Sequence, residues 1–402
     1  MGSAWLAQRT GASIVNGNHE LFGHGDMRLN DGESFGFGKL TFKALHTPGH
    51  TPESMCYVLY DEGSGDADSA YCIFSGDTLF YGDTGRTDLP DRDKSVENAG
   101  VLYDSVHSKL AGLADSALIL PAHGPGSVCG SGMAERPYST LGEEKRYNQV
   151  FVLEREAFAR QKGGENIPRP PFFRHMEKVN LNGGLAPVVR PGDVRLLDVD
   201  AFRKGRADAL VFDTRQPEGF AAGHIKDSYS IWLGGLPVFG GWVADESTPI
   251  YLLGDREEDI DQAVLHLTRI GLDNIQAGLA GGFGSWRNSG QPLTHAGVIT
   301  AQELNAERDT FQVLDVREAD EFASGHIAGA QHCYVGYLEN ELSKLDLDAT
   351  RPVVVTCGVG HRAGLGVSIL LRNGYRDVRN LLGGMSAWQA LKLPTEQKAG
   401  AE

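Results

Sequence analysis

The sequence predicts an α/β protein built from three modules. A length of 402 residues is enough for two or three domains. A β-branched apolar run at residues 353–356 is followed by a glycine loop and then by a helical pattern over 365–372, the strand–loop–helix order of α/β folds. A set of short signatures occurs twice, over residues 211–286 and again over 314–388. We therefore expect one N-terminal module followed by two copies of a second kind.

Bulk composition narrows the function classes. The chain is 41% hydrophobic and 22% charged, which is ordinary for a soluble globular protein. A formal charge of −16 argues against nucleic acid or an anionic membrane as partner. No run approaches the roughly 18 apolar residues of a membrane span, and no signal-peptide pattern opens the sequence. The cysteines are odd in number and irregularly spaced, which favours a reducing cytoplasm over a disulfide framework: Cys56, Cys72, Cys129, Cys333 and Cys357.

In the N-terminal module, residues 1–8 predict an amphipathic helix, and residues 11–15 and 40–45 predict strands. The second strand runs into a Pro-Gly loop that carries His50. Two further apolar runs end in ligand-type residues, one at Asp77 and one at His123. Histidine and carboxylate side chains at strand ends can meet a metal ion, so we expect these three residues to cluster at one edge of a sheet.

These residues resemble the metallo-β-lactamase family, an αββα sandwich, and within it the persulfide dioxygenase branch, which is similar to glyoxalase II. His50 matches the family's loop histidine, Asp77 its metal carboxylate and His123 its late histidine. The resemblance implies non-haem Fe(II) held by two histidines and one carboxylate. Residues 85–88 look like that branch's substrate-side segment, with Arg86 placed to meet a glutathione or persulfide anion. Three other histidines we expect to be structural or on the surface: His19, His24 and His46.

The sequence departs from the family at its first metal motif. His-x-His-x-Asp-His occurs nowhere in the 402 residues, and the family places it just upstream of the segment that matches residues 3–11. His50 and Asp77 supply two of the three expected ligands, while His123 belongs in the family to a second metal position. We therefore expect a partial, N-terminally truncated module that holds iron weakly or not at all. A shortened gene model and a natural variant both stay open. Apolar surface should be exposed where the missing strands would pack, which would make this module the least stable part.

Cys129 follows His123 in a glycine-rich loop and has two interpretations. It is either a small residue in that loop or a thiol beside the metal cleft that accepts a persulfide. Residues 141–162 are charged and helical in pattern and resemble the family's C-terminal helices. The proline-rich stretch that follows cannot be regular helix. We place the first module at 1–167 and a linker, packed through its aromatic residues, at 168–192.

The first copy of the repeat, expected over 193–295, lacks a nucleophile. Its middle strand ends at Gly254, where the other copy has Cys357, and residues 255–259 carry four carboxylates and one arginine. These charges would repel a thiosulfate or persulfide anion. We expect this copy to be catalytically silent and to cover or position its neighbours.

The second copy, expected over 298–396, places Cys357 between a strand and a helix. Amide groups and the helix dipole stabilise negative charge at that point, as on a thiolate or a persulfide. Gly358 and Gly360 let the loop curl so that its amides point inward. Arg362 adds a permanent cation that favours the thiolate. The alternative is a buried structural cysteine, the commonest state of a lone cysteine.

This copy resembles the rhodaneses, which are sulfurtransferases with parallel central sheets. The resemblance covers Ile299 to about Pro394 and rests on three signatures in order, over residues 314–330, 357–362 and 383–388. It implies that Cys357 holds the transferred sulfur and that the loop through Gly358, Gly360, His361 and Arg362 cradles it.

The order of the modules resembles bacterial fusions that detoxify sulfide-derived persulfides. It implies small sulfur donors and acceptors as partners: glutathione persulfide, thiosulfate and sulfite. Two rivals remain, a glyoxalase II-like metal-dependent thioester hydrolase and a non-enzymatic sulfur-carrier scaffold. The physiological thiol and the oligomeric state, a homo-oligomer included, stay open.

Overall fold

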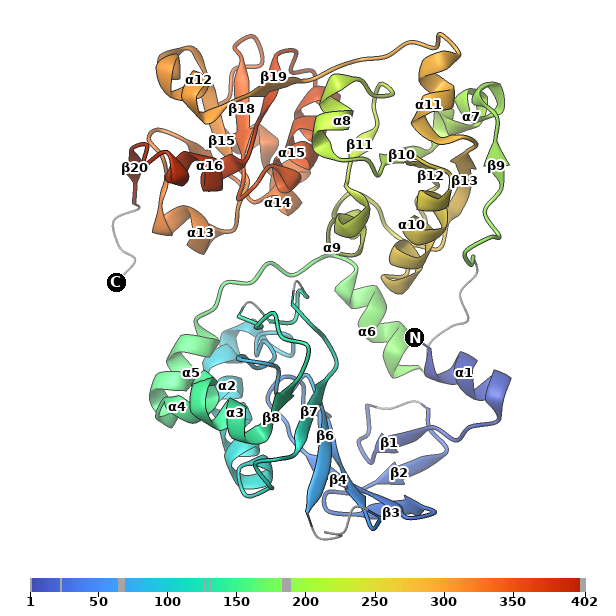
Figure 1. Cartoon of the computed structure of the whole chain (residues 1–402), viewed down its shortest axis with the longest axis vertical. Coiled ribbons are helices and arrows are strands. Elements are labelled where there is room, and N and C mark those ends of the chain that lie inside the picture. The colour runs from blue at the N-terminus through green and yellow to red at the C-terminus, as the bar shows by residue number, and fades with distance from the viewer. Residues whose placement is uncertain are drawn as a thin grey trace. The chain divides into compact units, whose positions relative to one another are not determined.

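The computed structural model describes residues 2–21, 24–63, 69–125, 127–130, 132–182 and 189–397. It divides into two compact units (Figure 1). The first unit holds Met1–Arg169 and Glu177–Ala186, and the second holds Pro170–Met176 and Pro187–Glu402. In these described parts, every helix is too short or too polar to cross a membrane.

The first unit is built on a six-stranded sheet. Its order is β3-β4-β5-β6-β7-β8, and all neighbours are antiparallel except β6 and β7. The strands are β3 (Ser34–Phe37), β4 (Leu40–His46), β5 (Met55–Asp61), β6 (Ala70–Gly76), β7 (Leu118–Pro121) and β8 (Ser139–Thr140). A separate parallel pair joins β1 (Val15–Gly17) to β2 (Met27–Leu29). The predicted strand at 11–15 is therefore wrong in position, because β1 begins where the prediction ended.

Helices α2 to α5 gather on one side of this sheet (Figure 1). The helices of the unit are α1 (Ser3–Thr10), α2 (Ser95–Ser105), which continues into a π-helical turn at Val106–Leu110, α3 (Leu141–Tyr147), α4 (Gln149–Val152) and α5 (Arg155–Gly163). Buried apolar side chains of the strands and of α2 and α5 form one core. The predicted helical stretch 141–162 is thus three helices, since Asn148 caps α4 in extended conformation.

Several large apolar residues of the sheet remain exposed. Phe37 is 58% exposed, Phe74 40% and Leu120 37%. The Phe42 ring lies 5.7 Å from that of Phe37 and 5.8 Å from that of Phe74, so these side chains form a row across β3, β4 and β6. Exposed large apolar side chains occur in the second unit as well, for example Val359 at 54%.

The second unit contains two five-stranded parallel sheets with the same topology. The first has the order β11-β10-β12-β13-β9 and the second β17-β15-β18-β19-β14. The first comprises β9 (Leu196–Leu197), β10 (Leu210–Asp213), β11 (Tyr229–Ser230), β12 (Ile250–Leu253) and β13 (Ile275–Leu279). The second comprises β14 (Gly297–Ile299), β15 (Gln312–Asp315), β17 (Gln331–His332), β18 (Val353–Thr356) and β19 (Val378–Leu381), and β16 (His326–Ile327) pairs separately with β20 (Thr395–Glu396). The matching order confirms the internal repeat.

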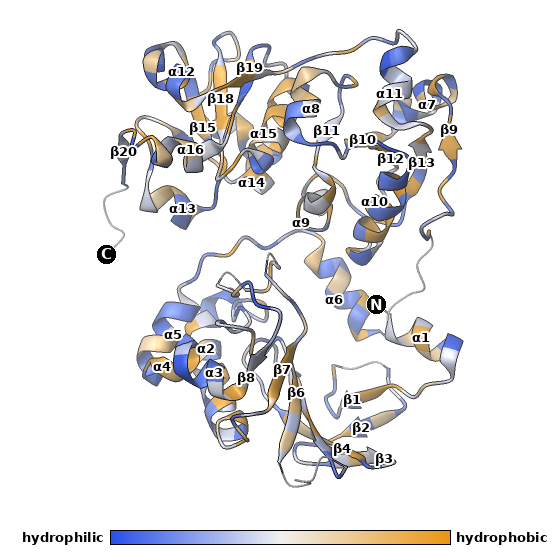
Figure 2. Cartoon of the chain, in the orientation of Figure 1, coloured by the Kyte–Doolittle hydropathy of each residue, from blue (hydrophilic) through white to orange (hydrophobic). Residues whose placement is uncertain are grey.

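Helices connect the strands of both sheets. Those of the first copy are α7 (Val199–Gly205), α8 (Pro217–Ala222), α9 (Leu236–Val243), α10 (Glu258–Arg269) and α11 (Gly282–Asn288). Those of the second are α12 (Ala301–Ala306), α13 (Ala319–Ser324), α14 (Val335–Glu341), α15 (His361–Arg372) and α16 (Gly384–Ala390). Figure 2 shows the central strand β18 as strongly hydrophobic, which is expected of a parallel strand covered on both faces. One apolar core runs through both copies, from Phe212 and Trp242 to Leu338 and Ala363.

The stretch expected as a linker carries its own structure. Helix α6 (Phe173–Leu181) lies inside it, and Phe172 just before the helix is 9% exposed and belongs to the core of the second unit. The remainder of the expected linker includes residues 183–188, which lie outside the described residues.

Candidate functional site

Cys357 lies where β18 ends and α15 begins. All four residues of β18 are buried, and Cys357 itself is 1% exposed. Gly360, the residue before α15, has φ 115°, a conformation that L side chains rarely adopt. This bend turns the amide of Gly360 back toward the cysteine, and its N–H donates to Cys357 Sγ at 3.1 Å. The loop therefore presents an amide donor and a helix N-terminus to the sulfur, both of which favour negative charge.

The glycine-rich segment before α16 holds this loop from the other side. Met385 N–H donates to the carbonyl of Cys357 at 2.8 Å, and Ser386 N–H donates to that of Gly358 at 2.9 Å. A Cβ on Gly384 would lie 2.3 Å from the Cys357 carbonyl oxygen, and φ there is 52°. Only glycine fits this position, so the closing signature of the repeat serves to fix the backbone of the loop.

Arg362 is bound to a carboxylate. Its guanidinium donates to both oxygens of Glu321 at 2.6 and 2.7 Å. Burial alone would raise the pKa of Glu321, but the hydrogen bonds and charge of Arg362 hold that pKa below its usual value. Glu321 sits in the upstream signature, yet sequence reasoning missed its role, because the partner lies 41 residues away.

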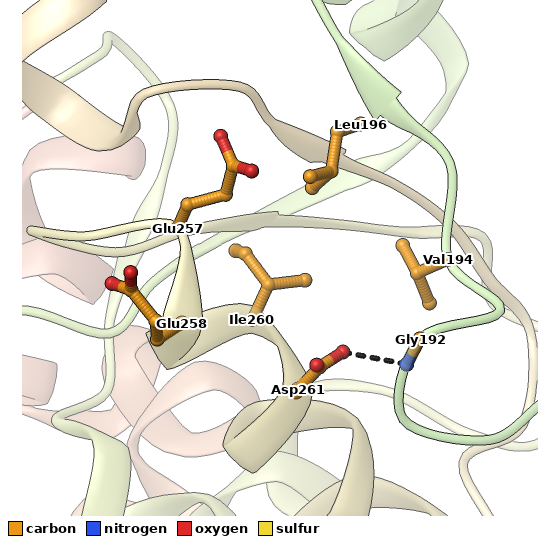
Figure 3. A pocket seen from close by; sticks show the side chains of 7 residues that line it. All are labelled: Gly192, Val194, Leu196, Glu257, Glu258, Ile260 and Asp261. Atoms are coloured by element: carbon orange, nitrogen blue, oxygen red, sulfur yellow. Dashed lines mark hydrogen bonds between the residues drawn. The ribbon is translucent and has the colours of Figure 1, made fainter.

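The first copy has glycine at the position of the thiol. Phe283 N–H donates to the carbonyl of Gly254 at 2.8 Å, the counterpart of the bond from Met385 to Cys357. Asp259 accepts from the amide of Arg256 at 3.0 Å, so a carboxylate occupies part of the loop. A nearby cavity of about 200 Å³ is lined by Glu257, Glu258 and Asp261 together with apolar side chains. Figure 3 shows the side chains of these three residues around it. The acidic character expected of this region is present.

In the first unit, three strand ends bring metal-type ligands together. Asp77 follows β6 and His123 follows β7, and these strands are parallel neighbours, so both residues leave the sheet at the same edge. His123 Nε2 lies 3.2 Å from Asp77 Oδ1. His50 comes from the loop after β4, and its Nε2 lies 3.9 Å from the same oxygen. Asp77 Oδ1 thus lies near both imidazoles at this edge of the sheet.

His50 is oriented by the backbone beside it. Its Nδ1–H donates to the carbonyl of Arg86 at 2.7 Å, which leaves Nε2 free to face Asp77. A Cβ on Gly85 would lie 2.2 Å from the carbonyl oxygen of Asp77 and 2.8 Å from His50 Nδ1. Glycine is required at this position because any side chain would collide with both groups.

Asp77 Oδ1 is buried and, among the described residues, has no well-directed hydrogen bond although His123 is close. Burial raises the pKa of Asp77, but the imidazoles of His123 and His50 lower it below its usual value. Hydrogen bonding to Asp77, and to a smaller extent to Cys129, raises the pKa of His123 to about 10. The ligand atoms of Asp77, His123 and Cys129 all lie within 4.8 Å of one another, so Cys129 is part of the cluster.

Arg86 differs from expectation. It is 1% exposed, and its guanidinium donates to both oxygens of Asp88 at 2.7 and 2.8 Å. The same group donates to the carbonyls of Val128, Ile167 and Pro168. A buried guanidinium with these bonds holds loops together and does not face an incoming anion. The substrate role predicted for Arg86 is therefore not supported.

Family models match both parts of the chain. The metallo-beta-lactamase superfamily model matches residues 6–131, and the rhodanese-like domain model matches 198–289 and 300–391. A crystal structure of a metallo-beta-lactamase from Staphylococcus aureus is 30% identical with a TM-score of 0.57, covering 69% of this chain and 79% of that one. The chain belongs to the metallo-β-lactamase superfamily. After this metallo-β-lactamase domain, the sequence continues with tandem rhodanese-like domains.

Among relatives of the metallo-β-lactamase domain, human mitochondrial persulfide dioxygenase ETHE1 is 31% identical over 160 residues, which is 40% of this chain and 55% of that protein. Hydroxyacylglutathione hydrolase GloC of Haemophilus influenzae is 32% identical over 118 residues, 29% of this chain and 44% of that protein. The chain spans about half the length of the curated relatives it matches. The predicted resemblance to a metallo-β-lactamase domain with persulfide dioxygenase relatives, followed by tandem rhodanese-like domains, is confirmed.

Proposed function

We propose that the chain acts in persulfide metabolism by transferring sulfur through a persulfide on Cys357. The observation that carries this proposal is the hydrogen bond from Gly360 N–H to Cys357 Sγ at the start of α15. An amide donor aimed at sulfur stabilises the thiolate before transfer and the persulfide anion after it.

Both half-reactions are displacements at sulfur. In the first, the Cys357 thiolate attacks the outer sulfur of thiosulfate, the S–S bond of the donor breaks, and sulfite leaves with the electron pair. In the second, an acceptor thiolate, or cyanide in an assay, attacks the outer sulfur of the cysteine persulfide and the Cys357 thiolate is regenerated. No external oxidant is required. The loop stabilises the negative charge of the Cys357 thiolate before transfer and of the Cys357 persulfide after it.

Detection of the Cys357 persulfide tests this proposal directly. The chain would be incubated with thiosulfate without an acceptor, and the peptide that contains Cys357 would be analysed by mass spectrometry. We expect a mass increase of one sulfur atom on Cys357 that cyanide removes. Sulfur found on another cysteine, with Cys357 unmodified, would contradict the proposal.

Iron is the metal that similarity to a persulfide dioxygenase implies for the first unit. The donor atoms present fit that ion only in part. Asp77, His123 and Cys129 are close together, whereas His50 Nε2 lies 3.9 Å from Asp77 Oδ1 and outside that group. A non-haem iron site takes two histidines and one carboxylate on one face with open positions opposite. The proposed sulfur transfer takes place at Cys357 and uses no residue of this site.

Metal content and product analysis separate the rival functions. Iron together with persulfide-dependent oxygen uptake would favour a dioxygenase. Two bound metals together with cleavage of a glutathione thioester would favour a hydrolase, the activity in the name of the relative from Haemophilus influenzae. Formation of thiocyanate from thiosulfate and cyanide would exclude a scaffold without transfer chemistry.

A further inference from the structure

His361, the first residue of α15, directs its side chain to the other rhodanese-like copy. Its ring stacks on that of Trp232, with centroids 4.9 Å apart and an interplanar angle of 22°. Its Nε2 lies 3.0 Å from Gln216 Oε1, which can only accept, so the ring donates this hydrogen bond. A residue of the transfer loop is therefore held by two side chains of the copy that lacks a thiol.

The fold of the silent copy explains where these side chains come from. Gln216 lies just after β10 and precedes α8, and Trp232 lies just after β11. Because β10 and β11 are parallel neighbours, both residues leave the same edge of the sheet. Trp232 is supported from behind: a Cβ on Gly235 would lie 2.7 Å from its ring, and the Phe239 ring is 5.4 Å away. The silent copy thus offers a fixed aromatic face.

Helix α15 packs against the first rhodanese-like copy at both of its ends. A Cβ on Gly364, one turn into the helix, would lie 2.8 Å from Cβ of Pro217, so the helix backbone packs directly against the Pro217 ring and leaves no room for a side chain. At the far end, Arg372 donates to the carbonyl of Asp227, and its guanidinium lies 4.1 Å above the ring of Tyr229. The helix that carries the transfer loop is therefore shared between the two copies.

We infer that the silent copy is a working part of the transfer site, in which Gln216 and Trp232 are positioning residues that hold His361 and thereby the start of α15. The inference rests on the proposed sulfur transfer. Two of the three residues between Cys357 and His361 are glycines, so the loop has little stiffness of its own. The amide that meets Cys357 Sγ belongs to Gly360, directly before His361. Fixing His361 thus fixes the donor that stabilises the sulfur anion.

The role predicts a particular kinetic effect. Gly360 remains in place on average when the hold on His361 is removed, so thiosulfate still binds. Its amide is less often aligned with the reacting sulfur, so the chemical step slows. We expect Gln216→Leu and Trp232→Leu each to lower kcat for transfer to cyanide by about fivefold, the rate equivalent of one weak interaction. KM for thiosulfate should change by less than about twofold.

Two comparisons separate positioning from general damage. Trp232→Phe keeps an aromatic face for His361 and should restore most of kcat, while Trp232→Leu keeps bulk without stacking. Gln262→Leu is a matched control, because Gln262, an exposed residue of α10, makes a Gln–His contact of 3.0 Å with His266 and, among the described residues, none with His361. The control should transfer sulfur at the wild-type rate.

The experiment measures kcat and KM for all four variants, with circular dichroism to establish folding and Cys357→Ser as the inactive reference. The inference is overturned if folded Gln216→Leu and Trp232→Leu keep the wild-type kcat, or if Trp232→Phe is as slow as Trp232→Leu. If one leucine variant does not fold, the other decides the matter, because each removes one of the two contacts that hold His361. An inactive wild-type protein would instead overturn the proposed function and this inference with it.

Discussion

Arg362 and Glu321 form a two-fold hydrogen-bonded ion pair beside the transfer loop, with N–O distances of 2.6 and 2.7 Å. The Arg362 side chain is 19% exposed and that of Glu321 is 38% exposed, so the pair lies at the margin of the interior. Glu321 belongs to α13 and Arg362 to α15, so the pair joins two helices that are separate in sequence.

Arg362→Ala should slow transfer less than Cys357→Ser does. The Gly360 amide still meets the sulfur anion in this variant, whereas the cysteine is the nucleophile itself. The unpaired Glu321 should also lower the free energy of unfolding by about 1 kcal/mol, a value reduced for solvent exposure. Steady-state kinetics and urea unfolding measure the two effects, and Arg362→Lys serves as a control for charge alone. Equal loss of activity in Arg362→Ala and Cys357→Ser would contradict the prediction.

A cysteine placed in the loop after β12 of the first copy should not create sulfurtransferase activity. Gly254→Cys in a Cys357→Ser background puts a thiol at the equivalent position, but residues 255–259 carry four carboxylates that repel an anionic donor. A Cβ there would also lie 2.7 Å from that of Asp259. Thiocyanate production should stay at the level of Cys357→Ser alone, and Asp255→Cys should behave alike. Measurable transfer would show that a missing thiol was the only deficit.

The 402-residue chain should bind iron weakly and consume little oxygen. The tight group of ligand atoms is Asp77, His123 and Cys129, and His50 is not part of it. Even the loss of an outer hydrogen-bonding partner of a metal ligand typically costs about 10–100-fold in metal affinity. The check is expression without oxygen in the presence of ferrous iron, followed by metal analysis and an oxygen electrode with glutathione persulfide. Near-stoichiometric iron together with persulfide-dependent oxygen uptake would contradict this expectation.

His224 should make the first copy sensitive to acid. It is 3% exposed, its Nδ1–H donates to the Phe220 carbonyl at 2.9 Å, and burial lowers its pKa from 6.5 to about 4. The folded state therefore binds fewer protons than the unfolded state between these two values. Stability contributed by the neutral ring is complete above pH 6.5 and falls as pH drops toward 4, by on the order of 3 kcal/mol.

Urea unfolding at a series of pH values measures this effect. His224→Asn keeps a donor for the carbonyl of Phe220 but cannot titrate, so its unfolding free energy should depend less on pH in that window. Arg215, Asp227 and His295 also face this ring and are unchanged in the comparison. An identical pH slope for wild type and variant would show that His224 does not carry the effect.

Local patterns predicted the parts of the sites that are contiguous in sequence. The strand, glycine loop and helix around Cys357 follow from a β-branched run, two glycines and a helical pattern within twenty residues. Asp77 and His123 were predicted to meet because each follows a strand, and residues at the ends of neighbouring parallel strands share an edge.

Contacts between segments that are distant in sequence could not be predicted from the sequence. Arg86 was expected to meet an anion, but it bonds to the carbonyls of Ile167 and Pro168, 81 and 82 residues away. The hold on His361 depends on Gln216, 145 residues away. A single sequence carries no signal for such pairs, since each side chain is compatible with many neighbours and only the packed fold selects one.

Sulfur transfer through Cys357 is tested most directly by the thiosulfate-to-cyanide assay on wild-type protein and on Cys357→Ser. Serine keeps the shape of the side chain and removes the sulfur nucleophile, so folding should be unchanged by circular dichroism. We predict that the wild type forms thiocyanate and that Cys357→Ser forms none above background. Thiocyanate formation by Cys357→Ser at the wild-type rate would contradict the account.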